Sequence, residues 1–338
     1  MIPLPGKPIT FAEYMERCLY DPEHGYYTSG RPVFGPAGDF YTSAHTHSLF
    51  AEILADTFAD LLGNVETSAG LQLVELGPGD RSLARNILSH LKRTHPSVVD
   101  NLEYVPVEVN QTLPDRICGI VFSNEFFDAL PVHRLRIRDG QMRELYVQAE
   151  TAGEIRETEG PVSDDRIPRY MKMAFGRARE GWDYEVNLRM LEFLEDLNLR
   201  ILQAYVFTID YGFLREEYHR SDRAAGTLLS YSRHEVVDNP YLQPGEQDLT
   251  AHVSFSVIIE TGRAMGWVNQ DLKNQRRFME DRGLAERLIR AEQRFQELNA
   301  DRVQELLQLK QLLQPGGISD VMRVLVQEVR LKKLTADD

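Results

Sequence analysis

The chain of 338 residues carries a formal net charge of -14 and is 42% hydrophobic, which suits a globular protein with a sizeable core. The excess of acidic residues argues against nucleic acid and anionic membranes as partners, because phosphate binding needs a basic face. It is compatible with a cationic ligand or a basic protein segment. No run of 18 apolar residues occurs and Cys18 and Cys118 have no metal-type spacing, so we expect no membrane span, no metal site and a reduced, cytoplasmic setting.

Residues 1–68 are predicted to form an N-terminal helical cap with a lid loop. Thr10 followed by Glu13 is typical of a capping box, which predicts a short helix that ends near Asp21. Residues 28–44 are rich in glycine, proline and small polar residues and predict a long loop, of the kind that often closes over a site. Apolar residues at helical spacing predict a second helix over about 46–62.

An α/β core is predicted from Leu71, and its first half occupies residues 69–131. A helix is predicted at Ser82–Lys92, after the first of three short apolar runs that predict strands. These strands are Leu71–Leu76, Tyr104–Val109 and Ile117–Ser123. Strands that alternate with helices indicate a mostly parallel sheet with helices on both faces.

Residues 132–203 are predicted to form an inserted hairpin and helical region. Asp139-Gly140 between two apolar segments, 132–138 and 142–148, is a hairpin signal. Residues 150–168 are predicted as loop or edge, and 184–199 as helix.

The second half of the core is predicted over 204–330, followed by a disordered tail at 331–338. Its expected strands are Ala204–Ile209, Thr227–Tyr231 and Val321–Gln327, and its expected helices are Val253–Met265 and residues 281–312.

The turn after the first core strand contains the sharpest local signal. Gly77 and Gly79 let a ligand approach the backbone closely, and the N–H groups of the following helix would face it. With Ser82, the spacing also fits a dinucleotide site. Glu108 ends the next strand, where a carboxylate commonly binds a ribose hydroxyl pair. These residues indicate an adenosine-type ligand, either a nicotinamide cofactor or S-adenosylmethionine, and a tight turn that binds nothing is the plainer alternative.

Polar side chains also follow the later strands. Asn124, Glu125 and Asp128 come after a buried strand, at the edge where open α/β sheets bind ligands. Carboxylates there are costly to desolvate without a partner. The structural alternative is a helix cap at Asn124 with Pro131 as breaker.

Two further polar groups stand at comparable points of the chain. Asp210 begins an Asp-Tyr-Gly turn after the next strand, where it could simply cap the turn. A polar run before a predicted helix contains Asp248 and His252, and Asp248 or Thr250 could serve as the N-cap of that helix.

Long motifs, in order from about residue 8 to 328, resemble those of the MidA family, which includes the mitochondrial complex I assembly methyltransferase. They are Phe11-Ala-Glu-Tyr-Met15, Leu19-Tyr-Asp-Pro22, Gly25-Tyr-Tyr27, Gly38-Asp-Phe-Tyr-Thr-Ser43, Glu75-Leu-Gly-Pro-Gly79, residues 123–133, Ile209-Asp-Tyr-Gly212, Gly226-Thr-Leu228, residues 244–253 and Pro315-Gly-Gly-Ile318. The resemblance implies a class I methyltransferase fold with a Rossmann-like sheet, S-adenosylmethionine as cofactor and symmetric dimethylation of arginine in a protein substrate. It specifies no oligomeric state.

The expected site residues follow from this resemblance and from guanidinium chemistry. Carboxylates hold a guanidinium bidentately and bias its charge, which favours acidic catalytic residues. The expected catalytic residues are Glu125, Asp128, Asp248 and His252. The expected cofactor-binding residues are Glu75, Gly77, Gly79, Glu108 and Asn124, with Asp39, Thr42 and Ser43 of the lid loop.

The sequence departs from the family pattern at two places. Arg81 stands where the family usually has a further glycine, and we expect its side chain to leave the turn and pair with Asp80 or Asp39. The alternative is that Arg81 lies across the turn and pairs with Glu75. Residues 109–122 are too few for the helix of about 11 residues and strand of about 5 that the family has there, which predicts a shortened adenine pocket.

These departures keep two other functions open beside an active methyltransferase. One is a cofactor-binding or assembly protein that kept the fold and lost turnover. The other is a nicotinamide oxidoreductase, which the spacing of Gly77, Gly79 and Ser82 would permit.

Overall fold

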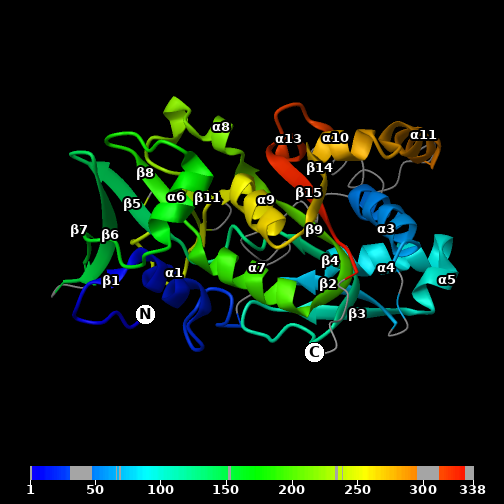
Figure 1. Cartoon of the computed structure of the whole chain (residues 1–338), viewed down its shortest axis with the longest axis horizontal. Helices are drawn as coiled ribbons and strands as arrows, with labels where there is room; N and C mark the ends of the chain where they lie inside the picture. The colour runs from blue at the N-terminus through cyan, green and yellow to red at the C-terminus, as the bar shows by residue number, and fades with distance from the viewer. Residues whose placement is uncertain are drawn as a thin grey trace. The chain divides into compact units, whose positions relative to one another are not determined.

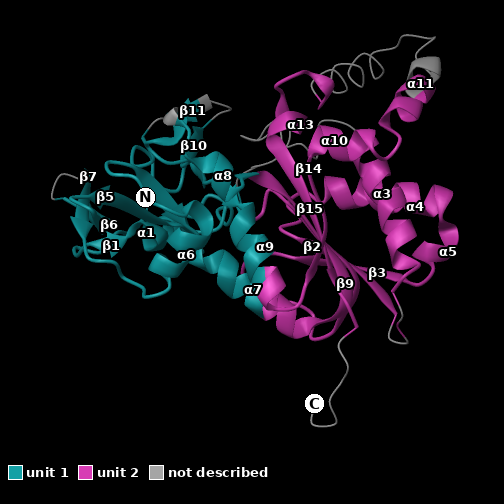
Figure 2. Ribbon diagram, turned by 45° about the horizontal axis from the view of Figure 1, so that its top comes forward, with its two compact units in different colours: residues 1–40, 127–195, 212–261 teal, residues 41–126, 196–211, 262–338 magenta. Residues whose placement is uncertain are grey.

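The computed structural model describes residues 2–30, 48–65, 67, 70–150, 154–232, 235–237, 239–294 and 312–331. The chain divides into two compact units, which Figure 2 shows in teal and magenta. Unit 1 comprises residues 1–40, 127–195 and 212–261, and unit 2 comprises residues 41–126, 196–211 and 262–338. Unit 1 therefore combines parts of the segments predicted as N-terminal cap, insertion and second half of the core.

A mixed sheet forms the centre of unit 2, with the strand order β14-β15-β9-β4-β2-β3 (Figure 1). The strands are β2 (Leu71–Leu76), β3 (Leu102–Val107), β4 (Ile117–Asn124), β9 (Ile201–Phe213), β14 (Val268–Asn274) and β15 (Met322–Val329). β3, β2, β4 and β9 run parallel, whereas β15 is antiparallel to both β9 and β14. The predicted α/β class and the largely parallel core are confirmed.

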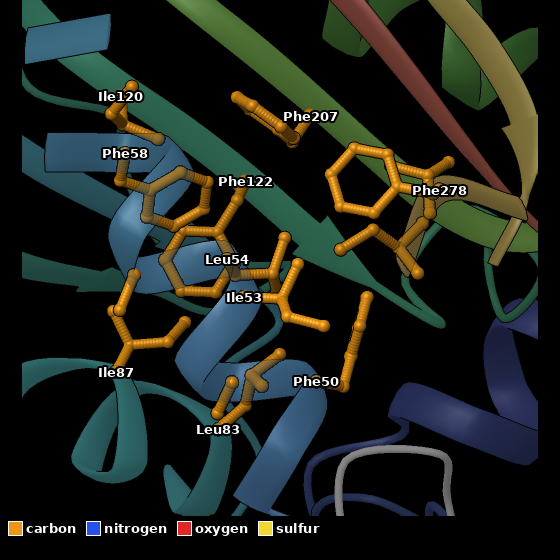
Figure 3. Close-up of a cluster of buried hydrophobic side chains, with 14 of the residues drawn as sticks. Phe50, Ile53, Leu54, Phe58, Leu83, Ile87, Ile120, Phe122, Phe207 and Phe278 are labelled. Carbon is orange, nitrogen blue, oxygen red and sulfur yellow. The ribbon is translucent and has the colours of Figure 1, made fainter. Parts of the chain in front are cut away.

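Helices cover one face of this sheet and bury its aromatic side chains. The helices of unit 2 are α3 (Ser48–Leu62), α4 (Ser82–Thr94), α5 (Pro96–Val99), α10 (Gln275–Glu280), α11 (Leu284–Arg294) and α13 (Ile318–Val321). Figure 3 shows Phe58 of α3 between Phe122 of β4 and Phe207 of β9, with ring centroids 5.6 and 4.8 Å away. Val74 and Val121 point to the opposite face and are also fully buried, so both faces are covered.

The segment between β3 and β4 contains no helix and no strand, as its length predicted. Residues 108–116 form an irregular loop with a turn at 109–110, and β4 pairs directly with β2. β3 is consequently the edge strand of the sheet.

Unit 1 contains a second sheet, of order β1-β6-β5-β8 with β7 paired to β6. Its strands are β1 (Ile9–Thr10), β5 (His133–Arg138), β6 (Gln141–Ala149), β7 (Ile155–Gly160) and β8 (Asp183–Val186). The predicted hairpin joins β5 and β6. Asp139 and Gly140 have φ values of 53° and 69°, the positive pair that a two-residue hairpin turn requires.

The remaining elements of unit 1 are short strands and helices. They are α1 (Phe11–Tyr20), α6 (Ile167–Phe175), α7 (Leu188–Arg200, whose last turn belongs to unit 2), α8 (Arg215–Tyr218), η1 (Ser221–Arg223), β10 (Leu229–Ser232), β11 (Glu235–Val237), β12 (Asp248–Thr250), β13 (Val253–Ser254) and α9 (Phe255–Ala264, which ends in unit 2). The Thr10–Glu13 capping box of α1 is confirmed in both directions.

Several predicted elements differ from the structure. Helix α6 and strand β14 were not predicted, and β8 occupies the start of the segment predicted as helix from residue 184. β14 reads Val-Asn-Gln-Asp-Leu-Lys-Asn, and its pairing with β15 at the sheet edge does not require the apolar run that marks a central strand. Of the helix predicted over 281–312, the described part is α11, and residues 295–311 and 332–338 lie outside the described residues.

Within the described part of the chain, no helix has both the length and the apolar character that a membrane crossing requires.

The packing of β4 on β2 depends on Gly119. A Cβ at this position would lie 2.2 Å from the backbone oxygen of Gln72, and the φ of Gly119 is +138°. Because a backbone atom of a central strand cannot move aside, we expect Gly119→Ala to lower the free energy of unfolding by about 3 kcal/mol. Denaturant unfolding measures this. Gly6→Ala, at a position with open space around it, is the control, and equal stability of both variants would contradict the prediction.

Candidate functional site

The carboxyl ends of the parallel strands in unit 2 meet at one edge of the sheet. Leu76 at the end of β2 pairs with Val107 of β3 and with Ser123 of β4, and Asn124 pairs with Ile209 of β9. The residues that follow the first three strands were all candidates, namely Gly77, Glu108 and Glu125, and Asp210 lies within β9 directly after Ile209. The register therefore brings them to a single edge, which is where open α/β sheets bind ligands.

The turn after β2 has left-handed backbone at three alternate residues. Gly77, Gly79 and Arg81 have φ values of 64°, 51° and 61°. The N–H of Gly77 donates to Val107 O at 2.9 Å, and the N–H of Arg81 returns to Pro78 O at 2.7 Å. A Cβ on Gly77 would lie 2.7 Å from the ring of Phe126, so packing alone requires this glycine.

Glu75 is a buried carboxylate next to this turn. It is 4% exposed and accepts a hydrogen bond from the Tyr104 hydroxyl of β3. Burial raises the pKa of Glu75 to about 7, against the lowering effect of that hydrogen bond. Sequence reasoning missed Tyr104. This residue lies on β3, two positions before the residue that pairs with Glu75, and residues two apart in a strand lie on the same face of the sheet.

Glu108, which follows β3, lies near enough to Arg81 for their charges to interact. Burial raises the pKa of the Glu108 carboxyl, and the positive charge of Arg81 lowers it. Arg81 itself is exposed. Among the described residues Arg81 has no ion pair within 4 Å, so neither Glu75 nor Asp80 is the partner expected from the sequence, and Asp39 lies outside those residues.

Asp80 interacts with the first turn of helix α4 instead. Its Oδ1 accepts a hydrogen bond from the N–H of Ser82 at 2.8 Å, and its carboxylate lies 3.9 Å from Arg85.

Asn124 is the last residue of β4, and no helix begins there. The helix-cap alternative for Asn124 is therefore wrong. Its amide donates to Glu125 Oε1 at 3.1 Å, and Glu125 has a φ of 53° with its N–H bonded to Ile209 O at 2.9 Å. This left-handed residue ends the strand and fixes where the carboxylate leaves the backbone.

A second group of acidic residues lies in unit 1. Asp248 begins β12, rather than capping a helix, and is fully buried, and Asp128 is 5% exposed. The Tyr27 hydroxyl donates to Asp248 Oδ1 at 2.8 Å. Burial and then the negative charges of Asp248 and Asp128 raise the pKa of Tyr27, which places both carboxylates near one phenol. We call Tyr27, Asp128 and Asp248 the Tyr27 cluster.

Aromatic rings surround the Tyr27 cluster. Tyr20 stacks on Tyr27 with ring centroids 5.7 Å apart, and Tyr26 meets Tyr27 edge-on at 5.2 Å. The Tyr20 hydroxyl donates to the backbone oxygen of Ala129, one residue after Asp128. Sequence reasoning quoted the Gly25-Tyr-Tyr27 segment as a motif but gave its tyrosines no role.

His252 is held through its backbone in unit 1. Its N–H donates to Thr227 Oγ1 at 3.1 Å, and Thr227 in turn donates its N–H and its hydroxyl to the buried carboxylate of Glu185 at 2.9 and 3.0 Å. Burial, together with the charge of Arg223, lowers the pKa of His252 to about 4. The imidazole is therefore neutral at physiological pH.

The predicted site residues thus fall into two groups. Glu75, Gly77, Gly79, Glu108, Asn124 and Glu125 belong to unit 2, whereas Asp128, Asp248 and His252 belong to unit 1. Asp39, Thr42 and Ser43 lie outside the described residues. In the described ranges, no three or more His, Cys, Asp or Glu side chains are grouped so that they could hold a metal ion.

Comparisons with known proteins agree on one family. The family model described as "Putative S-adenosyl-L-methionine-dependent methyltransferase" matches residues 53–117 and 113–272. The protein arginine methyltransferase NDUFAF7 homolog of Drosophila melanogaster is 26% identical over 78% of this chain and 68% of its own length. The Homo sapiens protein arginine methyltransferase NDUFAF7 is 28% identical over 74% of this chain and 65% of its own length.

A solved structure extends the similarity to the fold. The COG1565 superfamily member and likely methyl transferase from Burkholderia thailandensis, bound to S-adenosyl-homocysteine, aligns with a TM-score of 0.80 at 26% identity, over 97% of this chain and 89% of that one.

The comparison with curated relatives corrects one expectation. These relatives are named as mitochondrial proteins, which contradicts the cytoplasmic setting expected from the sequence. Net charge and a low cysteine content are shared by proteins of several compartments, so they could not support that expectation.

The raised pKa of Glu75 predicts a pH-dependent stability. Above pH 7 the folded protein carries a buried charge that the unfolded chain carries in water, so wild-type stability falls as pH rises from 5 to 8. We expect Glu75→Gln to gain about 2–3 kcal/mol over wild type across that range and to equal it below pH 4.5. Denaturant unfolding at each pH measures the difference. Glu103→Gln, an exposed carboxylate on β3, should show none, and a pH-independent Glu75→Gln effect would rule out this account.

Proposed function

Since this chain belongs to that family of S-adenosyl-L-methionine-dependent methyltransferases, we propose that its acceptor is an arginine side chain of a protein. The class I methyltransferase fold and the cofactor follow from the family and from the relative bound to S-adenosyl-homocysteine. This membership removes the nicotinamide alternative. The acceptor and the roles of individual residues are the proposal, and the names of relatives at 26% and 28% identity support it.

The glycine turn of unit 2 fits the cofactor by shape and by charge. Left-handed backbone at Gly77 and Gly79 keeps both positions free of a Cβ in the turn that precedes helix α4. Burial disfavours the charged forms of Glu75 and Glu108, and a nearby cation relieves that cost. The cofactor supplies a methyl group on a positively charged sulfur, together with an ammonium group.

Each cofactor-binding residue receives a separate role in the proposal. Glu108 would hold the ribose hydroxyls from the end of β3, and Asn124 would present its amide from the end of β4. The Glu75 carboxylate would attract the positive charge of the cofactor, and the Tyr104 hydroxyl would orient that carboxylate. Asp39, Thr42 and Ser43 remain proposed as lid-loop contacts.

The Tyr27 cluster is the observation that supports an arginine acceptor. Two buried carboxylates near one phenol form a strongly negative environment, and a guanidinium matches carboxylates with a fork of N–H donors. The stacked rings of Tyr20 and Tyr27 add faces to which a guanidinium is attracted. We assign Asp128 and Asp248 to holding the guanidinium and biasing its charge.

Two further residues complete the proposed catalytic set. His252, neutral because of its lowered pKa, adds no positive charge that would repel a cationic substrate. Glu125 contributes a carboxylate at the end of β4, held by the Asn124 amide. Because His252 is already neutral above pH 5, its titration does not lower the methylation rate in that pH range.

The acceptor is tested by methyl transfer from radiolabelled S-adenosylmethionine to proteins of a lysate from cells that lack this enzyme. Hydrolysis of the labelled proteins should release labelled dimethylarginine, in the symmetric form. Label on another amino acid would refute the arginine proposal. Cofactor binding without any transfer would favour the alternative of a binding or assembly protein.

We expect Gly79→Val to abolish measurable cofactor binding while the fold is kept. A β-branched side chain would fill the space that the ligand needs and resists the φ of 51°. Gly70→Val is a matched control in the same unit, with a φ of +87° and no atom within 4 Å of a built Cβ. It should carry a similar strain and bind normally. Calorimetric titration decides, and unchanged affinity in Gly79→Val would mean that the turn is only structural.

We expect Asp248→Asn to reduce arginine methylation at least 100-fold with cofactor affinity unchanged within twofold. Asparagine keeps an oxygen for the Tyr27 hydroxyl and removes only the charge that holds the guanidinium. The matched control is Asp222→Asn, an exposed carboxylate of the same unit. Methylation by Asp248→Asn at the wild-type rate would exclude a substrate role for the Tyr27 cluster.

A further inference from the structure

Arg81 is a cation placed by the backbone of the glycine turn. Its φ of 61° is in the left-handed region, and its N–H closes the turn on Pro78 O at 2.7 Å. Arg81 directly precedes helix α4 and has no side-chain capping bond there. A positive charge at a helix N-terminus is disfavoured by the helix dipole, so the helix itself does not account for an arginine at this position.

The charges around Arg81 are those of the proposed cofactor site. The Gly77 N–H binds Val107 O, so the turn adjoins the end of β3, where Glu108 follows. Burial raises the pKa of both Glu75 and Glu108, and the positive charge of Arg81 opposes that rise at each carboxyl. Asp80, its neighbour in sequence, accepts a hydrogen bond from the N–H of Ser82 and lies by Arg85. Arg81 thus acts on the two carboxylates without being fixed in an ion pair with either.

We propose that Arg81 sets the relative affinity for substrate cofactor and product, favouring S-adenosylhomocysteine over S-adenosylmethionine. The inference rests on the proposed cofactor site at the Gly77–Gly79 turn. The two molecules differ by the methyl group and by one positive charge on sulfur. S-adenosylmethionine and S-adenosylhomocysteine share the adenosine and amino-acid parts, so the interactions of Arg81 with those parts cancel in the ratio of the two dissociation constants. The repulsion between Arg81 and the sulfonium affects only S-adenosylmethionine and therefore remains in that ratio.

The size of the effect follows from Coulomb's law. For an assumed separation of about 9 Å between the two like charges and an effective dielectric of about 40, Coulomb's law gives a change of about fivefold in a dissociation constant. The consequence is stronger competition by the product: the concentration ratio of S-adenosylmethionine to S-adenosylhomocysteine at which half of the enzyme holds S-adenosylmethionine is about fivefold higher than it would be without Arg81. The rate of methylation would follow that ratio.

Calorimetric titration of the full chain with each cofactor form tests the proposal. Arg81→Gln keeps a Cβ in the same turn and removes the charge, so the ratio of the S-adenosylmethionine to the S-adenosylhomocysteine dissociation constant should fall about fivefold. Arg81→Lys restores the charge and should restore the wild-type ratio. Arg85→Gln, one turn further along α4, removes the same charge beside Asp80 and should change the ratio less than twofold.

Salt gives a second measurement on the same proteins. Added sodium chloride should lower the ratio in wild type toward that of Arg81→Gln, because salt screens an exposed charge. An Arg81→Gln ratio within twofold of wild type, or an equal change in Arg85→Gln, would overturn the proposal. If Gly79→Val also left both affinities unchanged, the cofactor site itself would be misplaced. If Gly79→Val abolished binding, the site would stand and only the role of Arg81 would fall.

Discussion

The parallel register of β3, β2, β4 and β9 is the constraint on which the candidate cofactor site depends. Parallel strands end at a common edge, and here the pairing of Leu76 with Val107 and Ser123 aligns three ends closely. Each strand then delivers one polar or glycine residue to that edge. No sequence motif needs to bring these residues together, since the backbone hydrogen bonds of the sheet already do so.

Both units contain buried carboxylate side chains. Glu75 in unit 2, and Asp128 and Asp248 in unit 1, are carboxylates withdrawn from water. Burial of a carboxylate costs free energy that a hydrogen-bond donor or a cation can offset. The protein provides tyrosine hydroxyls as donors, Tyr104 for Glu75 and Tyr27 for Asp248. A neutral donor orients a carboxylate without cancelling its charge, so each site still attracts a cation.

The departures from the family pattern change particular features rather than the architecture. The short segment between β3 and β4 removes a strand and makes β3 the sheet edge, and the core strands keep their register. Arg81 takes a backbone conformation that suits glycine. The turn tolerates the substitution sterically, and what the arginine changes is the local charge.

The sequence by itself determined the features that depend on neighbouring residues. The Thr10–Glu13 capping box and the Asp139-Gly140 hairpin follow from local sterics and hydrogen bonds, which a short segment already contains. The bounds of β2 follow from a short apolar run that ends in a glycine turn. Tertiary structure decided the rest, because it depends on pairs that are distant in the chain. Tyr27 meets Asp248 across 221 residues, and Glu125 and Asp128, three positions apart, belong to different units because the chain leaves unit 2 between them.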